Sequence, residues 1–287
     1  MSNPLVKKIA IGTVQFGLDY GISNVSGKTK ENDIASIFNY AVKHGIDTID
    51  TAQAYGSSEE TISKYHQDKF KIVTKLNCNL FPNFSVEQLI NESLKKLRVD
   101  RLYSVLYHSF NPLDHYENIH EELLKMKKIG VIKKIGLSAY EQIEIERYIE
   151  KFGKPDIIQI PYNFLDKRLE NLMIDLHTKG VEIHSRSVFL QGLLLINPNE
   201  LGDHFGEIKP LLNELQNQFI NKDSLAGFLL SFVLQKSFID KVIIGVNNFH
   251  QFFSNVNNIY SEQKQLNNYH LKEMSASILN PNMWPKN

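Results

Sequence analysis

Predicted strands and helices alternate along almost the whole of this 287-residue chain. Short runs of aliphatic and β-branched residues, such as 71–76, are followed by segments with apolar residues at helical spacing, such as 85–97. The predicted strands are 8–12, 46–49, 71–76, 102–107, 132–137, 156–160, 181–183 and 242–244. Eight such units in roughly 250–290 residues are typical of a (β/α)8 barrel. A doubly wound sheet is the alternative, but no G-x-G-x-x-G motif follows a predicted strand.

We therefore predict an α/β fold of the TIM-barrel type, in a single domain over residues 1–287. No linker or break in composition interrupts the alternation. The connection over 186–222 is long for a loop, and its part 209–219 has helical spacing. A C-terminal tail follows over 262–287, and its Trp284 could contact a substrate pocket or pack on the barrel.

The charge balance argues against several classes of partner. The 32 basic and 32 acidic residues give a net charge of zero, which offers no attraction to nucleic acid or to an anionic membrane. The single cysteine, Cys78, excludes an internal disulfide framework and a multi-cysteine metal site, and no H-x-H or H-E-x-x-H pair predicts a metal. The first residues lack the apolar core of a signal peptide, and the most apolar stretch, 225–234, is too short to span a bilayer. We expect a cytoplasmic, soluble protein, and the sequence does not indicate its oligomeric state.

The stretch 45–56, with the sequence GIDTIDTAQAYG, brings a carboxylate and a phenol to the end of one predicted strand. Asp50 falls where the strand ends, and Tyr55 follows in the loop before an N-terminal helix signature at 57–60. Ligands bind at this end of the strands in parallel α/β folds. In isolation, such a pattern is more often a turn-capping aspartate and a half-buried tyrosine. The residues at the other strand ends are therefore needed to choose between a structural and a functional role.

The other predicted strands also end on residues that core packing does not require. In chain order the strand ends offer Thr13, Asp50, Lys75, His108, Ser138, Gln159, Arg186 and Gly245. We expect Lys75 and Asp50 to form an ion pair, because an unpaired charge buried there would be very costly. The ammonium of Lys75 should also lower the pKa of Tyr55 towards the range of a general acid or base. With His108, these groups would deliver a proton to a carbonyl oxygen.

These residues carry a resemblance to the aldo-keto reductase family, from Ile9 to about Asn255. The shared motifs are Gly12-Thr13, Asp50-Thr51-Ala52 with Tyr55-Gly56, Thr74-Lys75, Ser93-Leu94 with Leu97 and Asp100 before His108, Gly136-x-Ser138, Gln159-x-x-Tyr162-Asn163, and Ile244-Gly245 with Asn255. The family fold is a (β/α)8 barrel that binds a nicotinamide dinucleotide without a Rossmann domain. The resemblance implies that Tyr55 is the proton donor, that Asp50 and Lys75 tune it, and that His108 orients the carbonyl.

The resemblance also implies a set of cofactor contacts. Ser138 and Gln159 would hold the nicotinamide carboxamide, and Arg186 stands where the family usually has an aromatic residue stacked on the ring. The full set is Gly12, Thr13, Val14, Asp50, Ser138, Gln159, Arg186, Ser187, Leu190, Gly192, Gly245, Val246, Asn248, Gln251 and Asn255. NADP(H) is the expected cofactor and NAD(H) the alternative. Family members specific for NADPH usually place a lysine or arginine shortly after the glycine of strand eight, but none occurs between 245 and 255.

Some of these residues also have simpler interpretations. Arg186 could be a rim arginine paired with an acid. His184 is better explained as a residue of the barrel interior, and Cys78 as a small hydrophobic residue. The loop that begins at Ser187, which covers the pyrophosphate in the family, could be a plain surface loop.

Three functions of different classes remain at this point. The first is an NAD(P)H-dependent carbonyl reductase or alcohol dehydrogenase, and the second is a non-catalytic nucleotide-binding regulatory protein of the same fold. The third is a barrel lyase in which Lys75 forms a Schiff base with its substrate.

The runs GTVQFGLDYGI and HSRSVFLQGLL resemble those of reductases associated with bacterial surface polysaccharides. A polar rim of Arg186, Asn163 and His108 would suit a hydroxylated keto-sugar.

Overall fold

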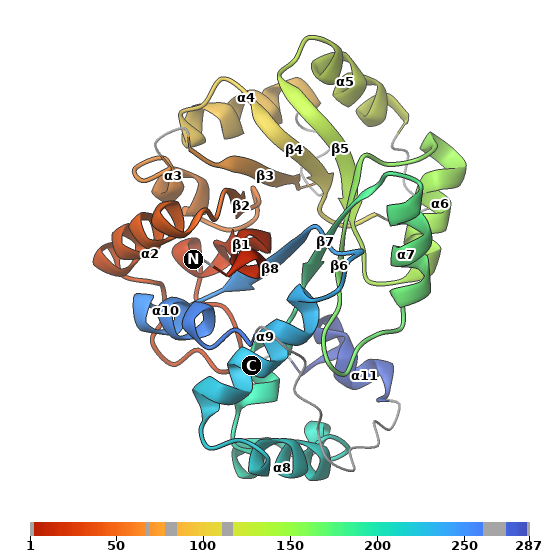
Figure 1. Cartoon of the computed structure of the whole chain (residues 1–287). Coiled ribbons are helices and arrows are strands. Elements are labelled where there is room, and N and C mark those ends of the chain that lie inside the picture. The colour runs from red at the N-terminus through yellow and green to blue at the C-terminus, as the bar shows by residue number, and fades with distance from the viewer. Residues whose placement is uncertain (1–2, 67–68, 78–84, 111–116, 261–273, 286–287) are drawn as a thin grey trace.

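The fold is a closed barrel of eight parallel strands, in the order β1-β2-β3-β4-β5-β6-β7-β8 (Figure 1). This computed structural model describes residues 3–66, 69–77, 85–110, 117–260 and 274–285. The strands are β1 (Ile9–Gly12), β2 (Thr48–Asp50), β3 (Lys71–Leu76), β4 (Leu102–Tyr107), β5 (Ile132–Ser138), β6 (Ile157–Pro161), β7 (Glu182–Arg186) and β8 (Lys241–Gly245). The predicted (β/α)8 barrel is confirmed.

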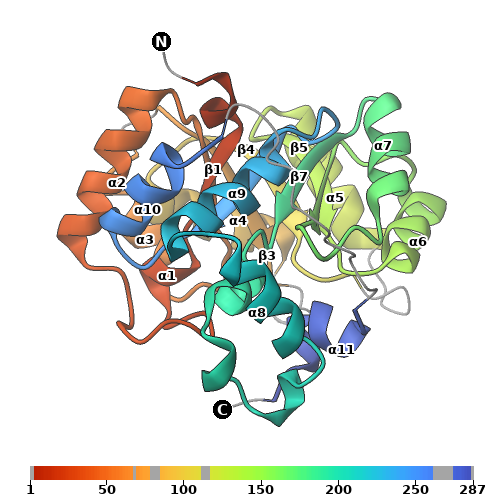
Figure 2. The same ribbon diagram turned by 60° about the horizontal axis from the view of Figure 1, so that its bottom comes forward.

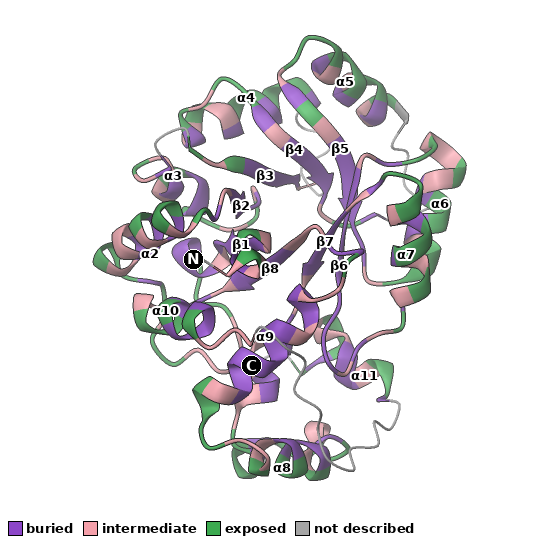
Figure 3. Ribbon diagram, in the orientation of Figure 1, coloured by how far each residue is buried: buried purple, intermediate pink, exposed green. Residues whose placement is uncertain are grey.

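Helices surround the strands as an outer layer. They are α2 (Glu31–His44), α3 (Ser58–Ile62), α4 (Val86–Leu97), α5 (Glu117–Lys128), α6 (Gln142–Phe152), α7 (Glu170–Thr178), α9 (Lys222–Leu234) and α10 (Phe249–Asn257), with the short α1 (Val14–Gly17) after β1. Figure 3 shows the strands almost wholly buried, whereas the outer helices carry exposed residues. The main apolar core lies between these two layers. None of the helices within the described ranges is long and apolar enough to cross a bilayer.

Local sequence signals explain where several helices begin and end. Ser85 accepts the backbone N–H of Gln88, and the Gln88 side chain accepts that of Ser85, so a capping box starts α4. Helix α2 ends at Gly45, whose φ of 73° is left-handed and suits a residue without a Cβ. The next strand, β2, begins at Thr48 and delivers Asp50 to the barrel end.

The register aligns the ends of neighbouring strands. Gly12 pairs with Asp50 on one side and with Gly245 on the other, and Ser138 pairs with Gln159. Because all strands are parallel and the barrel is closed, their carboxyl ends form one mouth. The predicted polar strand ends therefore gather at the same end of the barrel.

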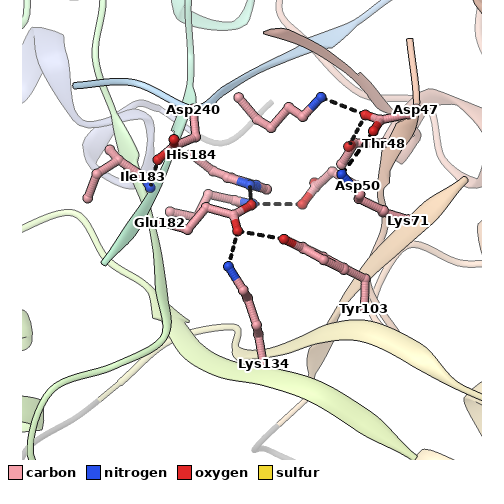
Figure 4. A network of polar contacts seen from close by, with 12 residues as sticks. Asp47, Thr48, Asp50, Lys71, Tyr103, Lys134, Glu182, Ile183, His184 and Asp240 are labelled. Carbon is pink, nitrogen blue, oxygen red and sulfur yellow. Dashed lines mark hydrogen bonds and ion pairs between the residues drawn. The ribbon is translucent and has the colours of Figure 1, made fainter. Parts of the chain in front are cut away.

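The barrel interior is apolar only in its middle. Val73, Leu106 and Ile157 form a small buried cluster there, and alternation along the strands puts Val73 on the same face as Lys75. At the amino end of the strands, Glu182 accepts hydrogen bonds from three neighbours in Figure 4. These are the Tyr103 hydroxyl and His184 Nε2, each at 2.6 Å, and the Lys134 ammonium. His184 is fully buried, which confirms its prediction as an interior residue.

A second apolar cluster lies beside the barrel, around the connection that follows β7. It contains helix α8 (Lys209–Asn217), the 3-10 segment Leu190–Leu195, helix α11 (Ala276–Leu279) and Trp284. Figure 2 shows α8 and α11 on the side of the barrel opposite the N-terminus. The Trp284 ring packs edge-on against Phe205 with centroids 5.2 Å apart. The described part of the tail therefore packs on this connection.

Candidate active site

A buried ion pair forms the centre of the barrel mouth. Lys75 Nζ donates to Asp50 Oδ2 at 2.7 Å, and the side chains are 1% and 5% exposed. Gln159 Nε2 donates to the other carboxylate oxygen, Oδ1, at 2.7 Å, and Lys75 also donates to the carbonyl oxygen of Thr51 at 2.9 Å. The predicted pair is confirmed, and the Gln159 amide N–H, which the resemblance directs to a nicotinamide, contacts Asp50.

Backbone contacts fix Asp50 and the loop that follows it. The backbone N–H and the hydroxyl of Thr13 both donate to the carbonyl oxygen of Asp50, at 3.0 and 2.9 Å. Ser58 donates its hydroxyl to Thr13 Oγ1 at 2.8 Å. A Cβ on Gly17 would lie only 1.8 Å from the carbonyl oxygen of Tyr55, so only glycine lets the two loops approach this closely.

Tyr55 and His108 lie directly against the ion pair. Lys75 Nζ is 5.1 Å from the centre of the Tyr55 ring. The rings of Tyr55 and His108 meet edge to face, with centroids 5.6 Å apart. The structure thus brings together the four residues that the sequence predicts as catalytic.

The pKa of Tyr55 departs from its ordinary value in the direction opposite to the sequence prediction. Burial raises the pKa of the phenol, and the carboxylate of Asp50 raises it further, while Arg186 opposes both. The predicted lowering by Lys75 is wrong, because the burial of the phenol and the carboxylate of Asp50 dominate the pKa of Tyr55. Tyr55 is therefore a neutral phenol at pH 7 and carries a transferable proton.

His108 is neutral at pH 7 as well. Burial, followed by the nearby charge of Lys75, lowers the pKa of its imidazole to about 4. A neutral imidazole has one N–H donor and one acceptor nitrogen. This ring can donate a hydrogen bond without adding a charge to the mouth.

Arg186 lies at the end of β7 and has neutral partners only. Its guanidinium carbon is 3.9 Å from the centre of the Tyr140 ring. Nη2 donates to the carbonyl oxygen of Ala139 at 3.1 Å, and Nη1 donates to Ser187 Oγ at 3.4 Å. Within the described ranges, no carboxylate lies within ion-pair distance, so the interpretation of Arg186 as a rim arginine paired with an acid is wrong.

A side-chain hydrogen bond joins the loop after β7 to the loop after β1. Gln191 Nε2 donates to the Tyr20 hydroxyl at 2.8 Å, and a Cβ on Gly192 would lie 1.9 Å from Ser23 Oγ. Three residues of the β7 loop that are not glycine have positive φ angles, namely Ser187 (63°), Leu190 (48°) and Gln191 (53°). Such strained backbone clusters at ligand sites.

The predicted contacts at β8 lie around the start of α10. Gly245 ends the strand, and a Cβ there would lie 2.6 Å from Gln15 Oε1. Asn248 caps the helix by accepting the N–H of Gln251 at 2.9 Å, Val246 is buried, and Asn255 is a buried residue of the same helix. Gly12, Thr13 and Val14 follow one another at the end of β1, on the strand next to β8.

Four residues of the site escaped the sequence analysis. Gln15 and Tyr140 each follow a recognised strand-end motif by two residues, and that spacing could have marked them. Tyr20 is found through its contact with Gln191. Asp33, which accepts the N–H of Phe249 at 2.8 Å, is 216 residues away in sequence, so no local signal marks it.

The prediction for Asn163 is wrong, and the prediction for Cys78 is not tested. Asn163 does not belong to a polar rim, because its side chain is fully buried and its amide bonds Ser187 O and the N–H groups of Leu165 and Asp166. Cys78 lies outside the described residues.

The chain is similar to known proteins over different lengths. It is 30% identical over 165 residues to the methylglyoxal reductase DkgA of Escherichia coli O157:H7, which covers 55% of this chain and 58% of that protein. It is 28% identical over 178 residues to the NADH-specific methylglyoxal reductase of Escherichia coli (strain K12), covering 52% and 54%. These matches span little more than half of each relative's own length.

A solved structure shares the fold over most of the chain. This is the aldo-keto reductase AKR11C1 from Bacillus halodurans in its holo form, at 20% identity and a TM-score of 0.71, with 90% of this chain and 88% of that chain covered. The sequence profile of the aldo/keto reductase family matches residues 8–278. The chain therefore belongs to the aldo/keto reductase family.

Proposed function

We propose that this protein reduces an aldehyde or ketone to an alcohol with NAD(P)H, and that Tyr55 donates the proton. The observation that carries the proposal is the position of Tyr55, whose ring lies 5.1 Å from Lys75 Nζ and against His108. A general acid has to hold its proton at the working pH and has to stabilise the anion that it becomes. The high pKa of the phenol meets the first requirement, and Lys75 meets the second.

Each residue has one part in the proposed reaction. His108 donates its N–H to the carbonyl oxygen and orients it, and Tyr55 transfers its proton to that oxygen as negative charge develops there. Lys75 stabilises the resulting phenolate, and Asp50 with Gln159 holds Lys75 in place. When bound, the dinucleotide supplies the hydride.

The residues at the ends of β8 and β1 suit a dinucleotide. Gln15 Oε1 is a buried acceptor without a partner, facing the bare Cα of Gly245. A ligand that donates a hydrogen bond there would satisfy Gln15, and the missing Cβ of Gly245 lets it come close. We infer that the predicted cofactor residues of β1, β8 and α10 bind the dinucleotide, with Ser138 and the strained β7 loop completing the site.

We predict that the protein binds both dinucleotides, with NADPH ahead of NADH by no more than about tenfold. Asp33 adds a reason for this weak preference, because its carboxylate accepts the backbone N–H of Phe249 and so places a negative charge beside the segment 245–255, where the 2′-phosphate would bind. Asp33→Asn keeps the hydrogen bond and removes the charge, so it should tighten NADPH binding several-fold and leave NADH binding unchanged. Fluorescence titration of each reduced dinucleotide measures this.

The matched control for Asp33→Asn is Glu31→Gln in the same helix, which also removes one negative charge. It should leave both dissociation constants unchanged. A preference for NADPH of about a hundredfold in the wild type would mean that a cation outside 245–255 reaches the phosphate, and would refute the prediction.

The substrate that we propose is a polar carbonyl compound such as a keto-sugar. Arg186 and His108 remain on the rim and are able to bond hydroxyl groups. Two relatives are named methylglyoxal reductases, so methylglyoxal belongs in the test as well. The cytoplasm stays the predicted location.

A panel of aldehydes and ketones tests the proposed function. It should include a keto-hexose derivative, methylglyoxal and a long aliphatic aldehyde, each with NADPH and with NADH, and we expect dinucleotide oxidation with the polar carbonyls. Binding of dinucleotide without turnover of any carbonyl would instead indicate the regulatory protein. Borohydride trapping of an adduct on Lys75 would indicate the lyase, although Lys75 Nζ is already bonded to Asp50 and Thr51.

A further inference from the structure

Arg186 places a positive charge in the barrel mouth that no residue of the described chain neutralises. The guanidinium stacks on Tyr140 and donates to a carbonyl oxygen and to a hydroxyl, and all three partners are neutral. Arginine stays protonated at every physiological pH. Arg186 therefore keeps a full charge in a half-buried position.

Arg168 provides a comparison, because its guanidinium is paired with carboxylates of this chain. Arg168 donates Nε and Nη2 to the two carboxylate oxygens of Asp166, at 2.9 and 3.0 Å, and lies 3.5 Å from Glu141. Asp166 is buried and serves this contact. Among the described residues, Arg168 thus has two acidic partners, Asp166 and Glu141, and Arg186 has none.

The remaining groups of the mouth do not balance the charge of Arg186. The charges of Asp50 and Lys75 cancel within their ion pair, and His108 is neutral at pH 7. Tyr55 is a neutral phenol, because burial raises its pKa, and the charge of Arg186 opposes that rise. Among these described groups Arg186 therefore carries the charge that is not compensated, and its field reaches Tyr55 and His108.

We propose that Arg186 binds an anionic group of the substrate, a carboxylate or a phosphate carried close to the carbonyl. This inference rests on the proposed carbonyl reduction and narrows its substrate to acidic or phosphorylated carbonyl compounds, including sugars of that kind. The stack on Tyr140 and the bonds to Ala139 O and Ser187 Oγ fix the plane of the guanidinium. A planar guanidinium held in this way matches the geometry of carboxylate and phosphate.

The test compares pairs of carbonyl compounds in which one member carries an anionic group and the other does not. 4-Carboxybenzaldehyde and its methyl ester form the carboxylate pair, and glyceraldehyde 3-phosphate and glyceraldehyde form the phosphate pair. Arg186→Gln should lower kcat/KM for the charged member of at least one pair by about 10- to 100-fold more than it lowers kcat/KM for the neutral member of that pair. Arg186→Lys keeps the charge but not the planar guanidinium. Its kcat/KM for the charged substrate should therefore lie between those of the wild type and of Arg186→Gln. Whichever pair responds identifies the anion.

Two further measurements separate this inference from the proposed function. If the wild type reduces no member of either pair, the proposed function fails. The inference is then still decided by calorimetric titration of 4-carboxybenzaldehyde and of glyceraldehyde 3-phosphate into wild type and Arg186→Gln. About tenfold weaker binding of one of them to the variant supports it, and equal binding of both refutes it. A third outcome is that Arg186→Gln weakens dinucleotide binding and lowers kcat/KM for charged and neutral substrates alike. The partner of Arg186 would then be a cofactor phosphate, which overturns the inference.

Discussion

Replacing Tyr55 with phenylalanine is expected to lower the rate of carbonyl reduction by roughly 10²–10⁴-fold while the dinucleotide still binds. The change removes the transferable proton and hardly alters the volume of the side chain. The phenyl ring keeps its place beside Lys75 and His108, so the loss falls on the chemical step. Single-turnover reduction of a substrate from the carbonyl panel measures the rate, and fluorescence titration measures the binding.

Tyr40→Phe is a matched control for this experiment. Tyr40 lies in the outer helix α2, where its hydroxyl accepts a hydrogen bond from Asn257 at 3.0 Å. Tyr40→Phe likewise removes one phenol hydroxyl, but from the outer helix layer. The rate of carbonyl reduction should therefore stay at the wild-type value. If the phenylalanine variant at position 55 kept more than about a tenth of wild-type turnover, with chemistry limiting, Tyr55 would not be the proton donor.

Lys75→Met should destabilise the fold by about 3–5 kcal/mol, because it leaves Asp50 buried without its cation. The Asp50 carboxylate would keep only Gln159 as a side-chain partner. Adding Asp50→Asn removes the uncompensated charge, so the double variant should regain most of the lost stability while remaining inactive. Urea unfolding measures the free energy of unfolding of all three proteins.

An exposed ion pair provides the comparison for this prediction. Lys179 and Asp175 lie four residues apart, with Nζ and Oδ2 at 2.7 Å, and both side chains are more than half exposed. Lys179→Met should cost about 0.3–0.5 kcal/mol. A double variant at positions 50 and 75 that is no more stable than Lys75→Met would show that an unpaired Asp50 is not the cause of the loss.

The barrel and the position of its mouth could be predicted because both depend on local patterns. Most strands are apolar runs with a polar residue at or near the carboxyl end, and parallel pairing in a closed barrel brings those ends together whatever the details of packing. Asp50 and Lys75 could be paired from the sequence because a buried charge needs a partner. This reasoning uses only residue type and strand position.

The rest of the site depends on directions and distances that the sequence does not contain. The end of β6 could be predicted, but not that the Gln159 amide turns towards Asp50. The shift of the Tyr55 pKa was predicted with the wrong sign, because proximity to Lys75 is visible in the pattern, whereas the burial of the phenol beside the Asp50 carboxylate is not. Asp33 on α2 contacts Phe249 on the neighbouring helix α10, 216 residues away in sequence, so its proposed part in cofactor preference appears only in three dimensions.

The buried charges link the two halves of the chain into one cooperative folding unit. Asp50, in the first half, takes one partner from β3 and the other, Gln159, from β6. Glu182, in the second half, takes the Tyr103 hydroxyl from β4. A half-barrel cut between β4 and β5 would leave both carboxylates short of a hydrogen bond in an apolar interior. Neither half can therefore reach its native interior alone, and the barrel gains the full stability of these contacts only when it closes.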